Sequence, residues 1–62
     1  MNRIREILDM KGLSQKDLAI KLGMDESTLS KIINGKKEVN LRTARRISKA
    51  LGWGIDYIWP PD

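Results

Sequence analysis

The chain contains neither cysteine nor histidine. Disulfide bonds and the usual zinc sites are therefore excluded. The first six residues, MNRIRE, contain no long apolar run, so the sequence predicts no signal peptide, no membrane span and a cytoplasmic location. With 62 residues, we expect a single domain, residues 1–62, that buries only roughly 60% of its unfolded surface. A partner chain is the stabilising device that remains.

Catalytic constellations are also lacking. The serines, which have no obvious base near them in the sequence, are Ser14, Ser27, Ser30 and Ser48. The acidic residues are dispersed over expected helix caps and solvated faces, and no glycine-rich phosphate loop is present. We therefore expect a protein that is not an enzyme and that holds no cofactor and no metal.

Positive charge is abundant in one segment. The net charge is +4, but residues 31–49 hold seven lysines and arginines against the single acid Glu38, which gives that segment +6 and the rest of the chain −2. A basic block suggests a polyanionic partner. On charge alone, a solvated helix face explains the block equally well.

Five helices and no strand fit the apolar periodicity, so the fold class is all-α. Helix starts are predicted by a capping box, Ser14-x-x-Asp17, and by Asn40, while Gly23 predicts a helix end with positive φ. The helices are expected over residues 2–10, 15–22, 26–33, 41–51 and 55–59. The expected buried residues at the C-terminal end are Leu41, Ala44, Ile47, Leu51, Trp53, Ile55 and Ile58. Ile20 is expected on the exposed side of the second helix.

The most informative stretch is QKDLAIKLGMDESTLSKIING, residues 15–35. Ala19 precedes Gly23 by four residues, and Leu29 and Ile32 follow that glycine by six and nine. This spacing is typical of two short helices packed at a steep angle through a tight turn, the helix-turn-helix. With Leu13-Ser14-Gln15 before it and Asn34-Gly35 after it, the chain resembles the lambda-repressor-like (Cro/CI, XRE-type) family. The helix-turn-helix would span residues 14–34.

This resemblance implies a function. It implies a prokaryotic or phage-encoded transcriptional regulator, a repressor, that binds double-stranded DNA as a homodimer. The operator would be a palindrome with half-sites about one helical turn apart. An antitoxin or another protein-interaction module can use the same fold, and this alternative stays open. The polar, basic surface around the third helix favours DNA.

The third helix is expected to read bases. By resemblance, Glu26, Ser27 and Lys31 occupy positions that touch base edges, and Thr28 lies near phosphate or base. The side-chain chemistry fits, because Lys31 can donate to guanine, Ser27 and Thr28 can serve either base, and Glu26 can accept from cytosine. Glu26 could equally be a first-turn carboxylate that stabilises the helix by interacting with its dipole. Asp25 is expected to cap this helix.

Phosphate contacts are expected on both sides of the third helix. Gln15, at the start of the second helix, matches a backbone clamp of the family, although a solvated glutamine is the plain alternative. The basic turn after the third helix supplies Asn34, Lys36 and Lys37, and Arg42 follows near phosphate or the minor groove between half-sites. Arg3 and Arg5 are further candidates for flanking phosphates.

Two further expectations concern packing. Many relatives place a buried Arg–Glu pair where this chain has Leu8 and Ile33, so we expect these two apolar side chains to touch. In related proteins the dimer forms near the fourth and fifth helices. The corresponding candidates here are the aromatic residues Tyr57 and Trp59, whose amphipathic rings suit an interface.

Overall fold

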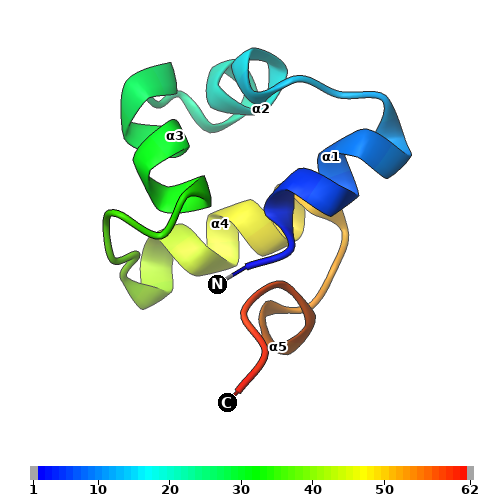
Figure 1. The fold of residues 1–62 in the computed structure, drawn as a ribbon, viewed down its shortest axis with the longest axis vertical. Coiled ribbons are helices and arrows are strands. Elements are labelled where there is room, and N and C mark those ends of the chain that lie inside the picture. The colour runs from blue at the N-terminus through cyan, green and yellow to red at the C-terminus, as the bar shows by residue number, and fades with distance from the viewer. Residues whose placement is uncertain (1, 62) are drawn as a thin grey trace.

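The computed structural model describes residues 2–61, and within that range the chain is all-α (Figure 1). The five helices are α1 (Ile4–Lys11), α2 (Gln15–Leu22), α3 (Glu26–Ile33), α4 (Leu41–Leu51) and α5 (Ile55–Ile58). The all-α, five-helix prediction is confirmed. None of these helices combines the length and the apolar character needed to cross a bilayer.

The helix ends follow the local signals in the sequence. The Oγ of Ser14 accepts from the N–H of Asp17, and the Asp17 carboxylate accepts from the N–H of Ser14, which completes the capping box before α2. Asn40 caps α4 by accepting from the N–H of Thr43 at 2.8 Å. Gly23 ends α2 with φ of 66°, a backbone conformation that glycine adopts without strain.

Three helix boundaries differ from the prediction, and one of them is the end of α1, which lies at Lys11 and not at residue 10. α1 begins at Ile4, not at Asn2, because the side chain of Asn2 accepts from the N–H of Ile4 and thus stands outside the helix. α5 ends at Ile58, since Trp59 has left helical dihedrals with φ of −119° and ψ of 78°.

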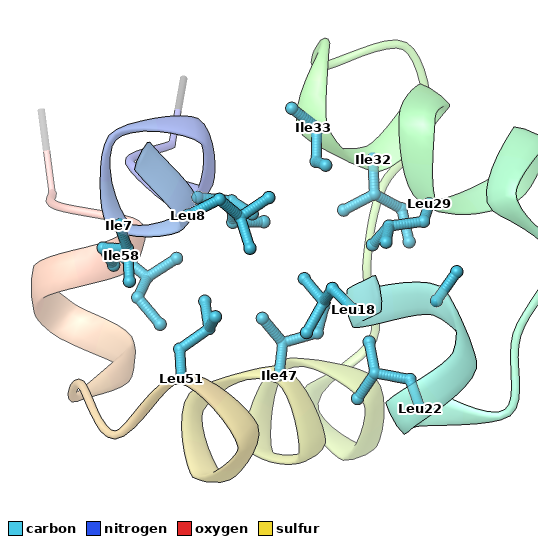
Figure 2. Close-up of a cluster of buried hydrophobic side chains, with 12 residues drawn as sticks. Ile7, Leu8, Leu18, Leu22, Leu29, Ile32, Ile33, Ile47, Leu51 and Ile58 are labelled. Carbon is cyan, nitrogen blue, oxygen red and sulfur yellow. The ribbon is translucent and has the colours of Figure 1, made fainter. Parts of the chain in front are cut away.

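One apolar core joins all five helices (Figure 2). The first four helices contribute residues three or four positions apart, so that one stripe of each faces inward, and α5 contributes Ile58. The cluster consists of Ile4, Ile7, Leu8, Leu18, Ala19, Leu22, Leu29, Ile32, Ile33, Ile47, Leu51 and Ile58. No polar side chain is buried within residues 2–61. The side chains of the core are therefore all apolar, and the domain depends on their burial.

Leu8 and Ile33 both belong to this core, with exposed fractions of 3% and 6%. Neither position carries a charge that would need a partner. Their direct contact stays a prediction.

Burial at the C-terminal end differs from the prediction at two residues. Leu41 is 60% exposed, because it is the first residue of α4 and follows a largely exposed connection. Trp53 is 38% exposed, and its ring stacks on that of Tyr57. Ile58 is buried as expected, Ile55 is half-buried, and Ile20 is exposed as expected.

Candidate nucleic-acid interface

The turn between α2 and α3 is held by backbone hydrogen bonds. The N–H of Gly23 donates to the carbonyl of Ile20 at 3.1 Å, and the N–H of Met24 donates to that of Ala19 at 3.0 Å. This double closure is the usual way in which a left-handed glycine ends a helix. Ala19 is buried beside the turn, as expected for a small residue where the two helices approach.

α3 has two faces of different chemistry. Its buried face consists of Leu29, Ile32 and Ile33, which point into the core in Figure 2. Three of the predicted base-reading residues, Glu26, Ser27 and Lys31, are exposed, and the fourth, Thr28, is half-buried. The fold thus presents the predicted polar side chains to solvent from a helix that is anchored on its apolar side.

The start of α3 lacks the side-chain cap hydrogen bond that was predicted for Asp25. Asp25 occupies the position before the helix in extended conformation, with φ of −65° and ψ of 138°, but its side chain makes no cap hydrogen bond. The expected carboxylate cap is therefore wrong, although the helix begins where it was expected. The Asp25 side chain is exposed and leaves the first-turn N–H groups of α3 without a carboxylate partner.

Gln15, the predicted phosphate clamp, is the first residue of α2 and is half-buried. The capping box beside it uses the N–H groups of Ser14 and Asp17, so the backbone N–H groups of Gln15 and Lys16 lie outside it. Hydrogen bonds from the backbone and the hydroxyl of Ser14 hold the pKa of the Asp17 carboxyl below its usual range. Asp17 therefore stays ionised at neutral pH, and the box keeps the start of α2 ordered.

Asn34, another predicted phosphate ligand, is engaged within the protein. Its Oδ1 accepts from the guanidinium of Arg5 at 2.9 Å, and its Nδ2 donates to the carbonyl of Ser30 at 2.9 Å and to the Ser30 Oγ at 3.3 Å. Phosphate binding through Asn34 stays a prediction. A phosphate would first have to replace one of these internal bonds.

The remaining predicted phosphate residues lie on the exposed surface after α3. Lys36, Lys37 and Arg42 are all exposed, and the N–H of Lys36 donates to the carbonyl of Lys31 at 2.8 Å. That bond folds the basic turn back onto the last turn of α3. The turn therefore places positive charge next to the predicted base-reading face.

Lys37 also borders the C-terminal end of the chain. It lines one hollow together with Asn2, Val39 and Trp59. The structure thus brings a predicted phosphate ligand close to a predicted dimer residue, and the two regions share an edge.

The aromatic residues at the C-terminal end form a small stack. The Trp53 and Tyr57 rings have centroids 4.5 Å apart and planes 21° apart, and the Arg3 guanidinium carbon lies 4.4 Å from the Tyr57 centroid. Such stacking and cation–π geometry is favourable. Tyr57 and Trp59 are half-buried, so Trp53 is the most exposed aromatic ring of this region.

Three further side chains position the helix-turn-helix, and the sequence pattern did not assign that role to them. The Arg46 guanidinium donates to the carbonyl of Leu22 at the end of α2. Asn2 and Arg5 bond to the end of α3. Their partners are 24 to 31 positions away in the chain, so no periodicity within one segment could have indicated them.

Comparison with protein families agrees with this geometry. A family model described as helix-turn-helix matches residues 4–58, which is nearly the whole chain and includes all five helices. A separate comparison with curated proteins found no match.

Proposed function

The chain belongs to the lambda-repressor-type helix-turn-helix family, a family of DNA-binding transcription regulators, and from this we propose that it is a sequence-specific repressor. It would bind double-stranded DNA in the cytoplasm as a homodimer on a palindromic operator. α3 would enter the major groove, and the bound dimer would block polymerase sterically. Half-sites would lie about one helical turn apart.

The observation that carries this proposal is the division of α3 into two faces. Leu29, Ile32 and Ile33 anchor the helix in the core. Ser27 and Lys31 are exposed on the other side, and the basic turn with Lys36 follows at once. An exposed polar helix face beside a basic turn suits a groove whose edges carry hydrogen-bonding groups and whose rims carry phosphate.

Within this proposal, Ser27, Thr28 and Lys31 read bases, and Glu26 reads cytosine where it finds a donor. A second set of side chains contacts the phosphates and supplies affinity that does not depend on sequence. That set consists of Gln15, Asn34, Lys36, Lys37 and Arg42. Asn34 is exposed, as the two lysines and Arg42 are, but it would have to exchange an internal bond for a phosphate oxygen.

A selection of bound sequences from random DNA, followed by titrations of two variants, tests the proposal. Lys31→Ala should weaken the selected operator by about 1–3 kcal/mol and relax the preference at one base pair in each half-site. Lys36→Ala should weaken all sequences alike and reduce the salt slope by about 1. Lys49→Ala, in the last turn of α4, is the matched loss of one positive charge. If Lys31→Ala weakened every sequence equally, its base-reading role would be wrong.

Mobility shifts of the wild-type protein at two salt concentrations separate DNA binding from a pure protein-interaction role. Binding that weakens steeply as salt rises is expected from counterion release. No shift even at low salt would remove the DNA proposal.

The homodimer is proposed to form through the C-terminal aromatic region. Tyr57 and Trp59 were the sequence candidates, and the exposure of Trp53 adds a third ring to the same region. Sedimentation of the free protein and of its operator complex measures the association directly. Trp53→Ala should lower the cooperativity of operator binding, and a complex containing a single chain per palindrome would contradict the dimer.

A further inference from the structure

The segment before and at the start of α1 bonds to the C-terminal end of α3. The Asn2 Nδ2 donates to the carbonyls of Ile32 at 3.0 Å and Ile33 at 3.3 Å. The Oδ1 of the same side chain accepts from the N–H of Ile4 at 3.2 Å. One amide group therefore closes the start of α1 and the end of α3 together.

A second set of hydrogen bonds also joins α1 to the C-terminal end of α3. The Arg5 guanidinium donates to the Oδ1 of Asn34, and the Nδ2 of Asn34 donates to the carbonyl of Ser30. Ser30 lies in the last turn of α3, so Arg5 fixes the amide that holds this turn.

These links complete the hydrogen bonding of a helix end. The last four carbonyls of a helix have no partner within it. In α3 these are the carbonyls of residues 30–33. The first three accept from the N–H groups of Asn34, Lys36 and Gly35 in the following turn. Asn2 adds a second donor for residue 32 and supplies a donor for residue 33.

We propose that Asn2 and Arg5 are positioning residues for DNA recognition, which hold the last turn of α3 and with it the side chain of Lys31. This inference rests on the proposed function. α3 has eight residues, and a helix of that length is not stable by itself. Lys31 lies in its last turn, so fraying of that turn would displace the side chain. A binding constellation has to be held within about 0.5 Å of its productive geometry.

Two substitutions separate positioning from other roles. Asn2→Asp keeps an oxygen that can accept from the N–H of Ile4, but it replaces the donor with an oxygen that faces two carbonyls. Arg5→Gln removes the guanidinium. Each variant lowers the net charge by one, and Lys49→Gln, in the last turn of α4, is the charge-matched control.

The first measurement is DNA binding at a temperature where all variants are folded. Both variants should weaken operator binding by about three- to tenfold relative to Lys49→Gln, which is the effect of losing one or two modest hydrogen bonds. Binding to non-specific DNA and the salt slope should equal those of the control. The ratio of specific to non-specific affinity is therefore the informative quantity, because a purely structural role would not change it in the folded protein.

The second measurement is amide hydrogen exchange without DNA. The N–H groups of Asn34, Gly35 and Lys36, which close α3, should exchange about three- to tenfold faster in Asn2→Asp, while those of α2 stay unchanged. This readout is independent of the proposed function. If the wild-type protein binds no DNA, the proposed function and the recognition role fall together, and the exchange data still report whether Asn2 holds α3.

Three results would overturn the proposal. The first is a specific-to-non-specific ratio equal to that of Lys49→Gln. The second is faster exchange in all helices, which would assign the two residues to general stability. The third concerns Arg5→Gln. An equal loss on all sequences, with a salt slope reduced by about 1, would make Arg5 a direct phosphate ligand.

Discussion

Leu8→Arg tests the packing of α1 against the end of α3. Leu8 is 3% exposed within the core cluster, and no polar side chain is buried within residues 2–61, so the new guanidinium would meet no charged partner. An uncompensated buried charge costs about 3–5 kcal/mol. The free energy of unfolding of a 62-residue chain is itself only roughly 3–9 kcal/mol. We expect the midpoint temperature to fall by about 15 °C or more.

The assay is thermal and urea unfolding followed by circular dichroism. Ile20→Arg is the control, since Ile20 is 70% exposed and the same charge there should change stability by no more than about 0.5 kcal/mol. Leu8→Met, which conserves volume, should cost less than about 1.5 kcal/mol. An unchanged melt for Leu8→Arg would refute the reasoning.

A double substitution shows whether Leu8 and Ile33 touch. Leu8→Arg together with Ile33→Glu introduces the charge pair that the family resemblance implies for these positions. If the two side chains are in contact, the double variant should be more stable than the sum of the two single costs predicts, by at least about 1 kcal/mol. Simple additivity would show that the two residues are separate parts of the core.

Two further predictions concern local structure. Gly23→Ala should lower the stability measured in a thermal melt by about 1 kcal/mol. The φ of Gly23 is 66° and the added Cβ would meet no atom within 4 Å, so only the backbone conformation opposes the substitution. Gly54→Ala, at φ of −68°, is the control, and an equal effect of both substitutions would contradict this reason. Asp17→Asn should reduce the loss of stability on acidification. The pKa of Asp17 is lowered by its bonds with Ser14, so its contribution is present above the unfolded pKa and is lost as pH falls through the lower folded value. Unfolding midpoints that fall equally between about pH 5 and pH 2 in both proteins would contradict this assignment.

Much of the fold could be predicted because its signals are local. Ser14 and Asp17 are three residues apart, and Asn40 caps the N–H of Thr43. The backbone N–H of Gly23 donates to carbonyls in the last turn of its own helix. Interactions between residues this close in the chain can be predicted from the sequence alone. The division of α3 into an apolar and a polar face follows from helical periodicity in the same way.

The errors lie where local pattern does not decide burial. Leu41 continues the apolar stripe of α4, yet it is exposed, since periodicity tells which side of a helix faces inward but not how far the neighbouring helices extend along it. Trp53 is large and apolar, yet it is partly exposed and stacks on Tyr57. One further error concerns a helix cap and not burial, because Asp25 precedes α3 without the expected carboxylate bond.

The sequence by itself determined the number of helices, most of their boundaries and the polar face that would meet DNA. Each of these depends on residues within about one helical turn of one another. The tertiary structure alone decided what holds that face in place. Asn2 and Arg5 bond to the end of α3, and Arg46 bonds to the end of α2. These contacts join segments 24 to 30 positions apart, and hydrogen bonds of that range exist only once apolar burial has brought the helices together.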